Sequence, residues 1–210
     1  MNPYRPDLIS TFGETSGVKA LVKIKQQMQQ DHDGSRILAE RPIVRSEFID
    51  LDALRKLPDN TFGKLYSQFL DYYGYNPDAR NPVSFIDDPD LAYIILRYRE
   101  IHDFVHVLLA QPTTILGEVN VKWVEAFQTK LPLTLLAGFF GPLRLTKNQT
   151  RKYLETDLRY AIKVGRSAKL LINVYFEKYF ERDIDDFRHS LAIPPPPSLP
   201  QFYSHKNAIY

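Results

Sequence analysis

Hydrophobic side chains recur every three to four residues along most of the chain, a spacing that is typical of amphipathic helices. This pattern predicts helices over residues 17–30, 35–41, 51–57, 62–73, 88–110, 115–130, 150–164, 167–179 and 183–191. Residues 43–48 are β-branched enough to be extended, although no other segment stands out as a partner strand. The sequence therefore predicts an all-α protein.

Local signals mark where several of these helices begin and end. Thr61 is a candidate N-cap for the helix over 62–73. The Asp-Pro-Asp sequence at 88–90 combines a capping carboxylate with a proline at the first helical position. The Gln-Pro pair at 111–112 should end that helix, because proline lacks an amide donor and restricts the residue before it. Either Thr113 or Thr114 then caps the next helix, which can return antiparallel.

A length of 210 residues suits one domain with a sizeable hydrophobic core. We expect a single-domain helical bundle over residues 1–193. Four consecutive prolines open the remainder, 194–210, which we expect to be a disordered tail.

Residues 131–143 contain no charged side chain, and two interpretations are open. The first is a helix of the core followed by a turn, which suits the length of the segment. The second is the wall of a lipid-binding groove or a surface that contacts a membrane. In that interpretation Phe139 and Phe140 form the tip, and Arg144 and Lys147 meet anionic headgroups.

Composition excludes several classes of site. The formal net charge is only +2, so electrostatics give no indication of nucleic-acid binding. The chain has no cysteine, which excludes disulfides and thiolate metal sites. No run approaches the roughly 20 apolar residues that a membrane-spanning helix needs, so any membrane contact should be peripheral. The first residues also lack the features of a targeting peptide.

Four potential metal ligands lie close together in the sequence: His102, Asp103, His106 and Glu118. On a helix, His102 and His106 lie about 40° apart around the axis, and Asp103 falls on the same arc. The proline turn that follows can bring Glu118 back to the same place. Two imidazoles and two carboxylates suit Zn²⁺, and also Mn²⁺, Fe²⁺ or Co²⁺. We therefore predict a divalent metal site between two adjacent helices, with Glu118 also a catalytic candidate.

Explanations of these residues that involve no metal are open as well. Histidines on helices are often structural, and a His-Asp-x-x-His string occurs by chance in many proteins. The zincin motif has glutamate as its general base where this chain has the shorter Asp103. Phosphohydrolases with an adjacent His-Asp pair need further histidine ligands, and no equivalent is obvious here. The remaining histidines lie in polar contexts and should be solvated: His32, His189 and His205.

Arg99 precedes Asp103 by four residues, so the two side chains should share one face of the helix. One interpretation gives Arg99 a catalytic role, in which its guanidinium contacts an oxygen of the substrate. The other interpretation is a salt bridge between Arg99 and Asp103.

Several short motifs are spread from residue 2 to about residue 193. They are Asn-Pro-Tyr-Arg at 2–5, Gly-Glu-Thr-Ser-Gly at 13–17, Glu-Arg-Pro at 40–42, Leu-Ala-Tyr at 91–93, Arg-Tyr-Arg-Glu at 97–100, Pro-Thr at 112–113, Gly-Glu at 117–118 and Phe-Phe-Gly-Pro-x-Arg-Leu at 139–145. The most specific is His-Asp-x-x-His at 102–106, followed by Glu118. With these motifs the chain resembles a known family, the fourth member of the coenzyme Q (ubiquinone) biosynthesis set.

The resemblance implies an all-helical protein held peripherally on the matrix side of the mitochondrial inner membrane, although no targeting peptide is visible here. It implies a metal at the residues matching His102, Asp103, His106 and Glu118. The resemblance implies two roles. One is to organise the multi-enzyme complex that builds ubiquinone, and the other is metal-dependent removal of the carboxyl group at ring carbon 1 of a polyprenylated hydroxybenzoate, coupled to hydroxylation there. The alternative is a non-catalytic scaffold that binds prenyl lipids and partner enzymes, with the metal merely structural.

The resemblance also implies the partners. They are polyprenylated hydroxybenzoate or quinone intermediates, the other ubiquinone-biosynthesis enzymes and a lipid surface. No nucleic acid is expected, and a homodimer is compatible with the resemblance.

Overall fold

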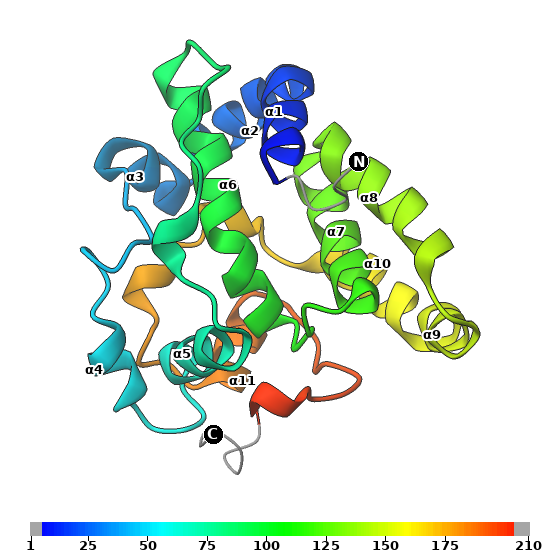
Figure 1. Cartoon of the computed structure of the whole chain (residues 1–210). Coiled ribbons are helices and arrows are strands. Elements are labelled where there is room, and N and C mark those ends of the chain that lie inside the picture. Colours follow the sequence, from blue (N-terminus) through cyan, green and yellow to red (C-terminus); the bar gives the residue numbers. More distant parts are fainter. Residues whose placement is uncertain (1–5, 204–210) are drawn as a thin grey trace.

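Helices joined by turns and longer loops make up the structure, a computed structural model that describes residues 6–203 (Figure 1). The α-helices are α1 (Pro6–Ser16), α2 (Val18–Gln30), α3 (His32–Glu40), α4 (Leu51–Arg55), α5 (Phe62–Tyr73), α6 (Pro89–Leu108), α7 (Ile115–Thr129), α8 (Pro132–Phe140), α9 (Lys147–Lys152), α10 (Leu158–Ser167) and α11 (Ile184–Ser190). The 3-10 turns are η1 (Pro77–Ala79), η2 (Gly141–Arg144), η4 (Leu171–Asn173), η5 (Phe176–Lys178) and η6 (Gln201–Tyr203), and η3 (Tyr153–Asp157) is a π-helix. No β-strand occurs in residues 6–203, which confirms the all-α prediction.

α6 runs through the middle of the bundle (Figure 1). It packs against α2, α3 and α5. Its start is as predicted, because the Asp88 carboxylate accepts from the amides of Asp90 and Leu91 at 2.8 and 3.1 Å, and Pro89 occupies the first position. The ring of Phe104 then packs edge-on to Phe62 of α5 within an aromatic part of the core.

The turn between α6 and α7 fixes how these two helices meet. Ala110 adopts a positive φ of 50°, and the Gln111 amide donates to the His106 carbonyl at 2.9 Å, which closes the end of α6. Thr114, of the two predicted candidates, caps α7 by accepting from the amide of Gly117. A Cβ on Gly117 would lie 1.9 Å from the Pro112 carbonyl oxygen, so only glycine lets the first turn of α7 sit against this loop.

The region after α10 differs from the predicted helix over 167–179. α10 ends at Ser167, and the chain continues in the 3-10 turns η4 and η5. The guanidinium of Arg97 is fully buried in this region, where it donates to the Val174 carbonyl at 3.2 Å and pairs with Glu177. A buried cation on α6 therefore takes a carbonyl that a continuous α-helix would use.

Three smaller differences concern other segments. Residues 43–48 form a loop and turn rather than an extended strand, and α1 was not predicted at all. The predicted helix over 150–164 is divided by the π-helix η3. These segments lack a partner strand or a clear hydrophobic period, so local sequence did not decide their conformation.

α8 and η2 occupy the uncharged segment 131–143 and lie at the edge of the molecule beside α7 (Figure 1). The interpretation of this segment as a core helix is wrong. Within α8 only Thr134 and Gly138 are buried. Large apolar side chains point outward instead: Leu135, Leu136, Phe139, Phe140 and Leu143, which is 81% exposed.

The proline-rich segment 194–203 packs on the bundle, in contrast to the disordered tail expected for 194–210. Phe202 is buried against the ring of Phe69, and the Tyr203 hydroxyl donates to the Val107 carbonyl at the end of α6. The aromatic side chains therefore anchor a segment whose proline-rich composition predicted disorder. Residues 204–210, including His205, lie outside the described part of the chain. Within residues 6–203 no helix is both long and apolar enough to span a membrane.

Candidate metal centre

Two rows of polar side chains face each other across α6 and α7. The residues of α6 are spaced four apart, and those of α7 are spaced four and then three apart, so each set lies on one face of its helix. The rows are Tyr98, His102 and His106 on α6, and Glu118, Lys122 and Glu125 on α7. The Gln111–Pro112 turn makes α7 return beside α6, so the predicted pairing of Glu118 with the two histidines is present.

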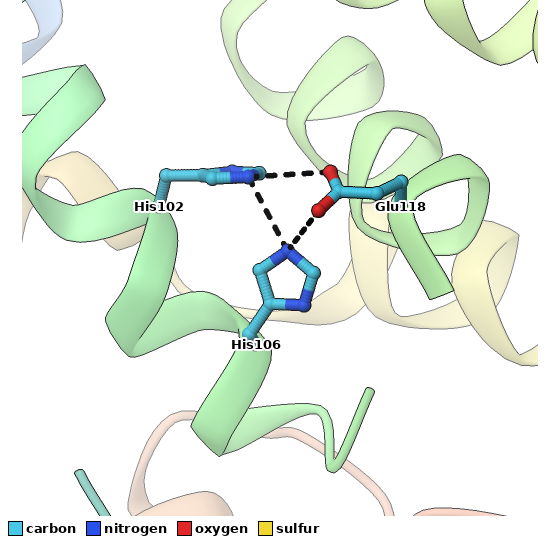
Figure 2. Close-up of side chains that lie close together, drawn as sticks. All are labelled: His102, His106 and Glu118. Atoms are coloured by element: carbon cyan, nitrogen blue, oxygen red, sulfur yellow. Dashed lines mark hydrogen bonds and ion pairs between the residues drawn. The ribbon is translucent and has the colours of Figure 1, made fainter. Parts of the chain in front are cut away.

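His102, His106 and Glu118 form a compact group (Figure 2). The Nε2 atoms of the two imidazoles are 3.2 Å apart. Glu118 places Oε2 at 3.4 Å from His102 Nε2 and Oε1 at 3.3 Å from His106 Nε2. One ligand atom from each residue lies within 4.8 Å of the others, which is a suitable arrangement for a metal ion.

The tautomer of each histidine follows from its second nitrogen. His106 Nδ1 lies 3.0 Å from the Gln111 carbonyl oxygen, which can only accept, so Nδ1 carries the proton. His102 Nδ1 lies 2.6 Å from Oε1 of Glu125 and donates to that carboxylate. Both Nε2 lone pairs therefore point at the same space. A cation between them, or a second proton on one ring, relieves this contact, and the donor set fits a divalent ion.

Asp103 is placed outside this group. Its carboxylate forms an ion pair with Arg80, which follows η1, although His102 is its chain neighbour. The reason is the 100° step of the helix, which aims consecutive side chains in different directions. Asp103 as a fourth ligand remains a prediction.

Arg99 does not make the salt bridge with Asp103 that was one of its two interpretations. Its Nη2 donates to Oε1 of Glu14 at 2.7 Å and to the Ser10 carbonyl at 3.0 Å, both on α1. Its Nη1 is buried and has no hydrogen-bond partner among the described residues. The predicted contact between Arg99 and a substrate oxygen remains a prediction.

The sequence profile of the family described as "Coenzyme Q (ubiquinone) biosynthesis protein Coq4" matches residues 1–197. The chain belongs to this family. The resemblance stated from the sequence motifs is confirmed, and Coq4 membership places the chain among ubiquinone-biosynthesis proteins.

Vertebrate members of the Coq4 family are similar over most of the chain. The mitochondrial ubiquinone biosynthesis protein COQ4 homolog of Xenopus tropicalis is 46% identical over 198 residues, which are 94% of this chain and 70% of the relative. The human homolog, also named mitochondrial, is 43% identical over 196 residues, 93% of this chain and 74% of the relative.

A crystal structure also shares the fold. A proposed ubiquinone biosynthesis protein of Nostoc punctiforme superposes with a TM-score of 0.66, at 21% identity. The superposition covers 84% of this chain and 82% of that one, and at this identity it shows the fold alone.

Charge interactions within the Coq4 centre shift the pKa values of its members. Burial and the Lys122 ammonium lower the pKa of His102, but the Glu125 and Glu118 carboxylates outweigh them and raise it to about 9. Burial raises the pKa of Glu118, but its contacts with His102 and His106 lower it overall. Burial likewise opposes ionisation of Glu125, whose pKa nevertheless falls to about 2 beside Lys122 and His102. In the ion-free protein at neutral pH, two ionised carboxylates therefore flank a protonated His102.

Sequence reasoning missed the residues behind His102. Glu125 and Lys122 are mostly buried, with side chains 5% and 18% exposed, and both contact the Tyr98 hydroxyl. A signal was present, because Glu118, Lys122 and Glu125 follow the spacing of one helix face. The predicted bystanders His32 and His189 are exposed and take no part in the centre.

Proposed function

We propose that this protein removes the carboxyl group at ring carbon 1 of a polyprenylated hydroxybenzoate during ubiquinone biosynthesis, with a divalent ion at His102, His106 and Glu118. The observation that carries the proposal is the pair of Nε2 atoms held 3.2 Å apart beside the Glu118 carboxylate. When bound, a divalent ion supplies Lewis acidity beside the substrate oxygens. Zn²⁺ suits these ligands best, and Mn²⁺, Fe²⁺ and Co²⁺ are compatible with them.

The bond between ring carbon 1 and the carboxyl carbon breaks, its electron pair stays on the ring, and carbon dioxide leaves. With dioxygen as the oxidant, a ring that carries a hydroxyl opposite the carboxyl group can supply all the electrons. Substrate and one dioxygen then give a quinone, carbon dioxide and water, and no separate reductant is needed.

The chain's own side chains would position the substrate. Glu118, 38% exposed, is the ligand that faces solvent, while His106 is buried, so we place the substrate on the Glu118 side. Arg99 is held by Glu14 of α1 and retains a free Nη1, which would donate to a substrate oxygen. Asp103 would join the ligands only by leaving Arg80.

The test is release of carbon dioxide from a short-chain prenyl-hydroxybenzoate by protein loaded with each of the four divalent ions. Glu118→Ala should abolish release and leave the helical circular dichroism unchanged. Glu155→Ala, which removes an exposed carboxylate of η3, is the matched control and should react normally. Normal turnover by folded, metal-free Glu118→Ala would overturn the proposal, and a parent protein that binds the ion without turnover would favour the scaffold.

We further propose that this protein lies on the mitochondrial inner membrane, at the matrix side, through α8 and η2. Five exposed apolar side chains gather here, among them Phe139 and Phe140 at 64% and 61% exposure. Arg144 and Lys147 are exposed next to them in the chain, which suits an anionic lipid surface. The protein should float with cardiolipin-containing vesicles at low salt, and a Phe139→Ser/Phe140→Ser double variant should remain behind. Equal flotation of parent and variant would exclude this surface.

A further inference from the structure

We propose that Glu125 is a positioning residue for the metal ligand His102: it holds the proton on Nδ1 and thereby keeps Nε2 free for a cation. The inference deepens the proposed function, because it rests on the same metal centre. It concerns a residue outside the His-Asp-x-x-His and Glu118 pattern.

The geometry around Glu125 fixes the carboxylate from both sides. Oε1 accepts from His102 Nδ1 at 2.6 Å. Oε2 accepts from the Tyr98 hydroxyl at 2.7 Å and from Lys122 Nζ at 2.8 Å. Because both oxygens are occupied and the side chain is only 5% exposed, Glu125 has little freedom to turn away from the imidazole.

The register of α7 explains how one helix serves both nitrogens of His102. Glu118 and Glu125 are seven residues apart, which is close to two helical turns, so both project toward α6. Glu118 lies at 3.4 Å from Nε2 and Glu125 at 2.6 Å from Nδ1 of the same ring. The imidazole is therefore held between a carboxylate that shares its metal and one that sets its tautomer.

The two histidines differ in the acceptor behind them. His106 Nδ1 donates to the neutral carbonyl of Gln111, whereas His102 Nδ1 donates to an anionic carboxylate. A carboxylate behind a histidine ligand fixes the ring and raises the basicity of the coordinating nitrogen, and its loss typically costs about 10- to 100-fold in metal affinity. Glu125 thus raises the basicity of His102 Nε2.

Zn²⁺ affinity, measured by competition with a chromophoric chelator, tests the inference on folded protein. We expect Glu125→Ala to weaken binding by about 10- to 100-fold. Glu125→Gln should lie between Ala and the parent, because the amide oxygen still accepts from Nδ1 but carries no charge. The control is Glu177→Ala. It removes a largely buried carboxylate that pairs with Arg97, which lies on α6 as His102 does, and it should leave the Zn²⁺ affinity unchanged.

A second readout separates positioning from a merely structural ion pair with Lys122. Nitrogen-15 NMR of the His102 ring in the ion-free protein, recorded above pH 9 where the ring is neutral, should show the proton fixed on Nδ1 in the parent and exchanging between the two nitrogens in Glu125→Ala. An unchanged tautomer in Glu125→Ala, or an equal loss of Zn²⁺ affinity in Glu177→Ala, would overturn the inference. If the parent bound none of Zn²⁺, Mn²⁺, Fe²⁺ and Co²⁺, the proposed function would fail, while the NMR measurement would still decide the role of Glu125.

Discussion

His106 Nδ1 donates to the carbonyl of Gln111, five residues later, at 3.0 Å. This contact exists because α6 ends in a left-handed residue, Ala110, which turns the Gln111 peptide back over the last turn of the helix. The end of a helix therefore sets the tautomer of a candidate metal ligand, and the same turn brings α7 beside α6.

Because this turn approaches α7 closely, Gly117 should tolerate no larger side chain. Gly117→Ala would place a Cβ 1.9 Å from the Pro112 carbonyl oxygen. The backbone must shift to relieve the clash, at a cost of about 1–3 kcal/mol. We expect urea denaturation to show this loss of stability and metal analysis to show weaker binding, because Glu118 is the next residue. Val119→Ala, a truncation on the same helix, should lower stability and retain the metal.

Removal of either imidazole should empty the metal centre. Purified protein should contain about one divalent ion per chain, and His102→Ala and His106→Ala should each lose it. Inductively coupled plasma mass spectrometry measures the content, and exposed His189→Ala serves as the control. If both variants kept the metal content of the parent protein, His102 and His106 would not be the residues that bind the ion.

The placement of Asp103 predicts a change in stability rather than in metal content. Asp103→Asn breaks the ion pair with Arg80, in which both side chains are only 17% exposed. We expect a loss of about 1–3 kcal/mol in the free energy of unfolding, with the ion retained. A variant that keeps parental stability but loses its metal would show that Asp103 is a ligand after all.

The pKa of His102 predicts opposite effects of pH on the ion-free and the metal-bound protein. It is raised to about 9 in the folded, ion-free protein, above the unfolded value of about 6.5. The resulting stabilisation is fully present below pH 6.5 and is lost as pH rises through 9. Protons compete with the ion for Nε2, so Zn²⁺ affinity should instead rise over this interval. Thermal denaturation and chelator competition at a series of pH values measure the two trends, and affinity that is flat with pH would contradict this explanation.

Sequence alone determined the helical class, the caps at Thr61 and Asp88, and the grouping of His102, His106 and Glu118. These features depend on helix periodicity, on capping side chains and on a proline turn, all of which are written within a few residues. The motif-based assignment to the family was also available at this level.

Only the tertiary structure decided which neighbours the remaining polar groups took. Asp103 and Arg99 share a helix face in the sequence, yet they pair with Arg80 and Glu14, which come from other parts of the chain. Glu125 reached His102 because α7 returns beside α6 in one register. Whether the apolar segment 131–143 was buried depended likewise on the space left beside α7, and no local pattern encodes that space. The sequence thus specified which groups could bind a metal, and packing between distant segments specified which of them were brought together.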